Sequence, residues 1–299
     1  MSKPSGSKTA AANAMPNDIC LWCYTNRKDP NKSFCSDKCT MEAGDEQPQL
    51  IPIPKGHVLY EGVKKSRNSG LITPKEYEIR KIYLVTRTNE SRAEYEKYRK
   101  GLEDKGNFVA KGKAIGNEVK RFRGADRACY LGEENDDEDP QMCIQPECKL
   151  CQSLIHGFGP YLHLKRTQGL ALKYANTTPD IESDIRVLML CKVALGRAYE
   201  TWKEHQTWDK PPDGYDSVHA MTTPDKAGKK SVFKYDERVV YTEKAMRPAY
   251  VVAVKRVEAP SASKAKKPAP KPRKKIPGLV RYKNTKKGRP GLLLRMLAR

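Results

Sequence analysis

The spacing of the nine cysteines constrains this chain more than any other feature of its sequence. Eight of them fall into two groups of four, and the ninth is Cys191. The groups are Cys20, Cys23, Cys35 and Cys39, and Cys129, Cys143, Cys148 and Cys151. Pairs of thiolates a few positions apart, with a second pair further on, are typical of tetrahedral zinc sites. The spacing therefore predicts zinc at both groups, although the acidic stretch 133–139 in the long gap of the second group departs from the usual pattern.

Other uses of these cysteines remain open at this point. Two disulfides in the first group would need an oxidising compartment, which nothing in the N-terminal sequence indicates. His156 lies close to Cys151 in sequence and can replace a thiolate in the second site. Cys191 lies within an apolar run, and we expect it to fill a core.

The charge of the chain is unevenly distributed. Residues 259–299 hold fourteen Lys and Arg and no Asp or Glu, so they carry two thirds of the net charge of +21. Their Lys, Pro, Ala and Ser composition predicts a disordered basic tail that can bind nucleic acid or serve only to solubilise the chain. We expect a disordered segment at 1–17, a zinc knuckle at 18–45, a linker at 46–75 and one folded domain at 76–258.

No apolar run approaches the roughly 18 residues of a membrane-spanning helix. The first residues lack the apolar core of a signal peptide. We therefore expect no membrane partner and an intracellular location, in the nucleus or cytoplasm.

Periodicity predicts an α+β fold in which strands dominate the second half. Residues 78–86, 186–198, 238–242 and 249–257 are apolar and β-branched enough for strands. The capping box 91–94 predicts a helix that buries Tyr95, Tyr98 and Leu102 on one face and stops near Gly106.

Two blocks in the second half present a carboxylate beside a turn. Residues 211–218 contain a Pro-Asp-Gly turn that leads into a strand, and Glu237 begins an apolar strand within residues 235–241. Glu237 is the first candidate for chemistry. The alternative is a strand-end carboxylate paired with Arg238 or Lys234. His156, His205 and His219 are isolated in the sequence, and we expect them at the surface.

The blocks 116–132, 158–175, 211–218 and 235–241 resemble the catalytic domain of poly(ADP-ribose) polymerases, in compact variants with cysteine clusters. The resemblance covers residues 76–258. It implies an ADP-ribosyltransferase-like fold of split antiparallel sheets with few helices. It also implies NAD as the substrate and a protein or nucleic acid as the acceptor of ADP-ribose.

The resemblance also assigns roles to individual residues. Glu237 matches the catalytic glutamate, and Gly124 matches the glycine whose backbone contacts nicotinamide. The remaining NAD contacts of the family are changed: Arg123 replaces the ribose-binding histidine, His163 replaces the stacking tyrosine, and Ala171 replaces a serine. Tyr174 remains to form the wall of the nicotinamide site with His163.

Two functions of different class follow. The first is an NAD-dependent ADP-ribosyltransferase, active or weakened by the changed contacts. The second is a non-catalytic scaffold, held together by zinc, whose basic tail binds nucleic acid or another polyanion.

Overall fold

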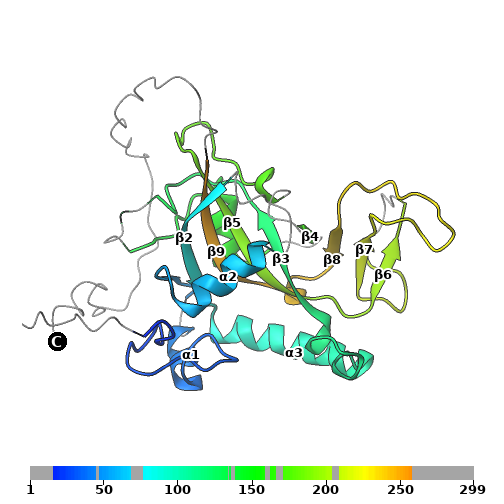
Figure 1. Ribbon diagram of the computed structural model, residues 1–299, viewed down its shortest axis with the longest axis horizontal. Helices are drawn as coiled ribbons and strands as arrows, with labels where there is room; N and C mark the ends of the chain where they lie inside the picture. Colours follow the sequence, from blue (N-terminus) through cyan, green and yellow to red (C-terminus); the bar gives the residue numbers. More distant parts are fainter. Residues whose placement is uncertain are drawn as a thin grey trace, which may run out of the picture.

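The computed structural model describes residues 16–44, 47–68, 77–133, 135, 139–158, 162–165, 171–203 and 209–257. Within these residues the fold is α+β, as predicted (Figure 1). The α-helices are α1 (Asp37–Ala43), α2 (Val58–Asn68), α3 (Asn89–Gly106) and α4 (Lys149–His156). The strands are β1 (Leu50–Pro52), β2 (Tyr77–Val85), β3 (Glu118–Gly124), β4 (Leu162–Lys165), β5 (Ile185–Ala194), β6 (Ala198–Thr201), β7 (Ser217–Ala220), β8 (Glu237–Val240) and β9 (Met246–Arg256). Short 3-10 turns are η1 (Val109–Lys111), η2 (Ile115–Asn117) and η3 (Glu243–Ala245).

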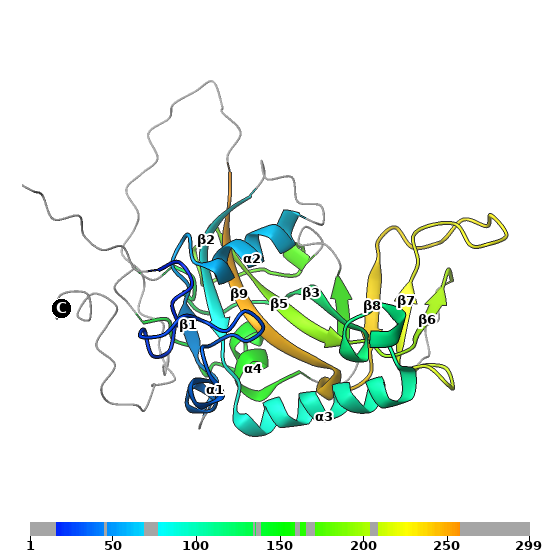
Figure 2. The same ribbon diagram turned by 60° about the horizontal axis from the view of Figure 1, so that its bottom comes forward.

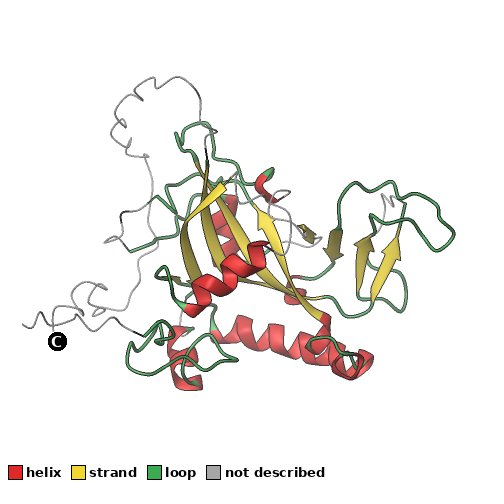
Figure 3. Ribbon diagram, viewed as in Figure 1, coloured by secondary structure: helices red, strands yellow, loops and turns green. Residues whose placement is uncertain are grey.

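The strands follow one order, β1-β2-β9-β5-β3-β4-β8-β7-β6. Between β3 and β4 the ladder narrows to a single pair, Phe122 with Lys165. The sheet therefore divides into a large half of five strands and a small half of four, which stand apart in Figure 3. Among the described strands, neighbours pair antiparallel except for β6 and β7, which run parallel. The long connection between these two strands brings the chain back to the same end of the sheet.

Strand β5 lies inside the large half, where it pairs with β3 on one side and β9 on the other. Strands β5 and β9 are rich in β-branched and apolar residues, so both faces of this part of the sheet are buried. Alternate residues point to opposite faces: Leu188 and Leu190 to the first face, Met189 and Cys191 to the second.

Each face is covered by different elements. The first face packs against α2 and the segment that contains the first cysteine group, through residues such as Val63, Leu21 and Phe34. The second face packs against α4 and the second cysteine group. Helix α3 runs along one edge of the molecule in Figure 2, and its buried Tyr95 and Leu102 pack with Phe108 and Ala194. The sheet thus lies between two cysteine groups.

Residues 46–75 are not the linker that we predicted from sequence. They contain β1, which pairs with the edge of β2, and α2, which covers the first face. Ile51, Ile53 and Val63 of this stretch are buried in the same core as Leu21 and Phe34. The first cysteine group is therefore packed against the sheet rather than tethered to it.

The other predicted elements agree with the structure except near their ends. The strand expected at 186–198 stops at Ala194, since a turn follows in which Gly196 has a positive φ of 56°. Helix α3 begins before the expected capping box, because the Thr88 hydroxyl accepts a hydrogen bond from the Ser91 amide. Gly106 is its last residue, and Asn107 ends it in the left-handed conformation.

Several expectations fall on residues outside the described ranges. These are most of the segment 1–17, the basic tail, His205 and the greater part of the acidic stretch 133–139. Apart from the stretch 46–75, the domain boundaries given above stay predictions.

Candidate functional site

The first cysteine group forms a compact tetrad. Its four sulfurs lie within 4.8 Å of one another. The Cys23 and Cys35 sulfurs are 3.7 Å apart, and those of Cys35 and Cys39 are 3.5 Å apart. A disulfide needs about 2.05 Å, whereas thiolates around one tetrahedral zinc lie about 3.8 Å apart. All four are free thiols and could hold a metal ion, in agreement with zinc.

Local structure aims these sulfurs inward. Cys20 and Cys23 lie in a tight turn that is closed by a hydrogen bond of 2.9 Å from the Tyr24 amide to the Cys20 carbonyl, and Tyr24 has a positive φ of 55°. Ser36 caps α1, so that Cys39 lies in its first turn facing Cys35. Burial raises the pKa of the Cys23 thiol. Backbone amides that hydrogen bond to its sulfur outweigh this effect and lower the pKa to about 7.

The second group forms a tetrad that is buried more deeply. Cys129 follows β3, Cys143 lies in the following loop, and Cys148 and Cys151 lie at the start of α4. The Cys129 sulfur is 3.7 Å from that of Cys148 and 3.8 Å from that of Cys151. Hydrogen bonds from Cys129, Cys143 and Cys151 lower the pKa of Cys148. This set could also hold a metal ion.

Two residues discussed in the sequence analysis, His156 and Cys191, do not belong to either tetrad. His156 ends α4 as an exposed residue and does not belong to either tetrad. Cys191 is fully buried in the second-face core, as expected. Burial raises the pKa of its thiol to about 12, although the charges of Arg123 and Arg87 lower it.

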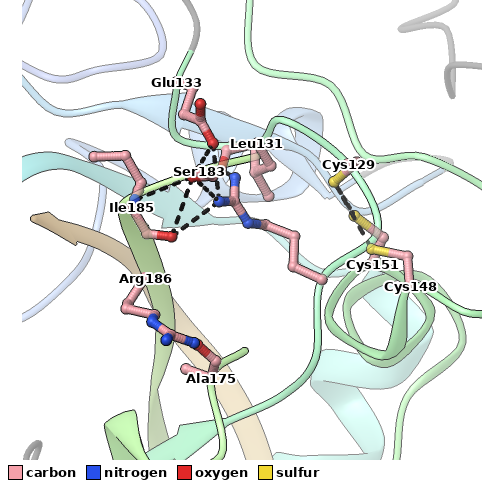
Figure 4. A network of polar contacts seen from close by, with 10 residues as sticks. Cys129, Leu131, Glu133, Cys148, Cys151, Ala175, Ser183, Ile185 and Arg186 are labelled. Atoms are coloured by element: carbon pink, nitrogen blue, oxygen red, sulfur yellow. Dashed lines mark hydrogen bonds and ion pairs between the residues drawn. The ribbon is translucent and has the colours of Figure 1, made fainter. Parts of the chain in front are cut away.

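A buried arginine beside the second tetrad was missed by the sequence analysis. Arg127 is 1% exposed, and its guanidinium donates hydrogen bonds to the carbonyls of Leu131 and Ile185, at 2.6 and 2.9 Å. It also donates to Glu133 and Ser183, at 2.9 and 2.8 Å. Figure 4 shows these partners next to the sulfurs of Cys129, Cys148 and Cys151. The network fixes the loop that carries the tetrad to the start of β5.

Three of the residues expected to contact NAD lie together. A Cβ placed on Gly124 would be 2.1 Å from the Ala171 carbonyl and 2.9 Å from the Tyr174 backbone. Gly124 therefore allows the end of β3 to touch the segment around Ala171–Tyr174. Ala171 is fully buried, whereas Tyr174 is 56% exposed.

Glu237 lies on the same face as this contact. The register joins Phe122 to Lys165, Lys165 to Glu237 and Glu237 to Ala220. Paired residues of neighbouring strands point to one face, and Phe122 belongs to the same core as Ala171. The Lys173 ammonium lies 5.3 Å from the centre of the Tyr235 ring, which links the Ala171 segment to the start of β8.

Arg123 points to the other face. Its guanidinium lies 5.3 Å from the centre of the Phe158 ring, in the region of Cys191. The structure thus separates Arg123 from Glu237 by the thickness of the sheet. The backbone of His163 pairs with Val239 in the small half of the sheet, and its side chain lies outside the described part of the chain.

His219 is not the surface residue that we expected. It is 8% exposed on β7, and its Nε2 is 3.2 Å from Oδ2 of Asp236. Burial raises the pKa of Asp236, but the hydrogen bond and charge of His219, with the charges of Arg238 and Arg121, lower it below its usual value. Nothing in the local sequence pairs residue 219 with residue 236; their contact follows from the pairing of β7 with β8.

Comparison with known proteins gives a distant and partial relation. No protein-family model matches the chain. Over 98 residues, 33% of the chain, the sequence is 26% identical to "Protein mono-ADP-ribosyltransferase PARP4" of Homo sapiens. It is 29% identical over 98 residues to the protein of the same name from Mus musculus. The matched segment spans 6% of the human and 5% of the mouse protein. The similarity indicates at most a relation to ADP-ribosyltransferases over a third of the chain.

The described helices were also compared with the requirements of a membrane span. None of them combines the necessary length with a sufficiently apolar composition.

Proposed function

We propose that this chain is an ADP-ribosyltransferase-like protein that binds NAD, holds zinc in both tetrads and transfers ADP-ribose to a protein or nucleic-acid acceptor. One observation carries the proposal. Gly124, residues 171–174 and Glu237, to which the resemblance assigns roles in the NAD site, lie on one face of the sheet. The partial similarity to PARP4 supports the same assignment.

The proposed reaction needs a carboxylate, that of Glu237, beside the ribose that is bonded to nicotinamide. Glu237 would stabilise the positive charge that develops on the ribose as its bond to nicotinamide breaks. The bonding electrons leave with nicotinamide, a nucleophilic oxygen or nitrogen of the acceptor forms the new bond to the anomeric carbon, and the acceptor loses its proton. Gly124 would offer backbone groups to the nicotinamide amide, with Tyr174 and His163 as the wall of the site.

The first test measures whether the protein consumes NAD. The full-length protein, incubated with labelled NAD, is expected to release nicotinamide and to become labelled. Glu237→Gln is expected to lower nicotinamide release by about 100-fold or more, because it removes the charge that stabilises the transition state. Glu200→Gln on β6, an exposed glutamate in the same half of the sheet, is the matched control and should keep full activity. Full activity in Glu237→Gln would contradict the role of this carboxylate.

The position of Arg123 favours a second function. A guanidinium buried against Phe158 does not replace the ribose-binding histidine of the family, and Ala171 offers no hydroxyl. These changes support a non-catalytic scaffold whose tail, residues 259–299, binds nucleic acid. Calorimetry that detects NAD binding without any release of nicotinamide would favour this scaffold. Deletion of the tail should then weaken nucleic-acid binding and reduce its salt dependence.

A further inference from the structure

Residues 221–235 form a projecting loop between β7 and β8, which we name the lysine loop. It extends beyond the sheet in Figures 1 and 2. Four of its side chains are exposed lysines: Lys226, Lys229, Lys230 and Lys234. Among the described residues, none of these four ammonium groups forms an ion pair within 4.0 Å. With four lysines and one carboxylate, Asp225, the loop carries a formal net charge of +3.

The single carboxylate of the lysine loop is bound by backbone amides of the loop. Oδ1 of Asp225 accepts hydrogen bonds from the backbone amides of Ala227 and Lys229, at 3.0 and 2.8 Å. The Asp225 amide donates to the Lys229 carbonyl at 3.0 Å, and Gly228 completes the turn with a φ of 78°. The carboxylate therefore shapes the turn that displays the lysines.

The base of the loop is tied to its neighbours. The Trp202 indole donates to the Thr223 carbonyl at 2.8 Å, and the Val232 amide donates to the Trp202 carbonyl at 3.1 Å. The Ser231 hydroxyl donates to the Met221 carbonyl at 2.6 Å. These bonds hold the loop in one shape before any partner binds, which lowers the entropic cost of binding.

Apolar groups accompany the charges. Val232 is 60% exposed and Tyr235 is 46% exposed. Lys173 approaches the Tyr235 ring and adds a further positive charge at the base of the loop. Exposed aromatic and apolar side chains between lysines are typical of surfaces that bind unpaired bases and their phosphates.

We propose that the lysine loop binds single-stranded nucleic acid. The lysines contact successive phosphates, and Tyr235 with Val232 contacts the bases. Two exposed apolar side chains are too few for the broad apolar face by which a segment enters a lipid surface. The net charge of +21 favours a polyanion as the partner. The proposal does not depend on NAD chemistry and stands apart from the basic tail.

The first experiment measures affinity against salt concentration. The full-length protein is titrated with labelled oligo(U) and oligo(dT) of equal length. Replacing Lys226, Lys229, Lys230 and Lys234 by Gln is expected to weaken binding to both probes. The slope of log K against log salt should become shallower by up to about 2.8, since each phosphate contact contributes about 0.7. The matched control replaces four exposed lysines elsewhere by Gln: Lys38, Lys55, Lys97 and Lys105.

The second experiment locates the contact despite the basic tail. A photoreactive benzoylphenylalanine at Val232 is expected to crosslink to the labelled oligonucleotide. The same group at Met41 of α1, which is also exposed, should not crosslink. An unchanged affinity and slope in the lysine-loop variant would overturn the proposal, as would an equal loss in the control variant. Loop-dependent binding to phosphatidylserine vesicles without binding to either oligonucleotide would overturn it too.

Discussion

At the scale of single residues, a close backbone contact decides what residue 124 can be. The end of β3 touches the carbonyl of Ala171 where any side chain on Gly124 would lie. The sequence resemblance had assigned this glycine to nicotinamide, and the contact gives it a structural role as well. The two roles agree, because the same contact holds residues 171–174 on the face of the sheet that carries Glu237.

Gly124→Ala is therefore expected to destabilise the fold by about 1–3 kcal/mol, as forced overpacking does in well-packed regions. The midpoint of urea unfolding measures this loss. Gly101→Ala is the matched control, because its Cβ would meet nothing within 4 Å on α3. There the same substitution should stabilise the helix by up to about 1 kcal/mol. Equal stability of the Gly124→Ala variant and the unmodified protein would contradict the contact.

At the scale of elements, the pairing of β7 with β8 creates a buried polar pair. His219 and Asp236 meet only because these strands lie side by side, and Arg238 stands opposite His219 in the register. Burial works against the ionised Asp236, but His219 and the arginines outweigh it and lower its pKa. Electrostatic interactions between Asp236, His219 and the neighbouring arginines thus contribute to the stability of the small half of the sheet.

This lowered pKa predicts a dependence of stability on pH. Asp236 stabilises the folded state fully above the unfolded pKa of about 3.9, and this contribution is lost as the pH falls through the lower folded pKa. Asp236→Asn should remove it, so unfolding midpoints of the variant and the unmodified protein should differ most near neutral pH and converge in acid. Asn at the exposed Asp180 serves as the control and should leave the pH profile unchanged. A constant difference at every pH would contradict the assignment.

At the scale of the whole molecule, two cysteine tetrads lie on opposite faces of one sheet. The first belongs to the core that contains α2, and the second to the core that contains α4. A metal ion bound in each tetrad would help to attach these segments to the sheet, because metal binding contributes free energy to folding. Cys23 and Cys35 are half-buried, whereas all members of the second tetrad are buried.

We expect two zinc ions per chain, one for each tetrad. Cys148→Ser should reduce the bound zinc to one and lower the melting temperature, and Cys191→Ala should retain both ions because Cys191 lies outside the tetrads. A chelator should remove the ion of the half-buried first tetrad faster than that of the second. Metal analysis and a colorimetric zinc indicator measure these quantities. Two ions remaining in Cys148→Ser would contradict the second site.

Local patterns predicted much of this architecture. Apolar runs located β2, β5, β8 and β9 to within a few residues, since burial of alternate or consecutive residues leaves a direct trace in sequence. The stretch containing β1 and α2 was misread as a linker, because a three-residue edge strand and a short helix owe their stability to packing on the sheet.

The sequence by itself determined the two groups of four thiols, the α+β class and the uneven charge, because cysteine spacing, periodicity and composition are local properties. Only the tertiary structure decided that Gly124 touches Ala171, that His219 meets Asp236 and that Arg123 points away from Glu237. Those outcomes depend on strand register and on which segments cross the sheet. Register arises from contacts between residues far apart in the chain, and no local pattern records it.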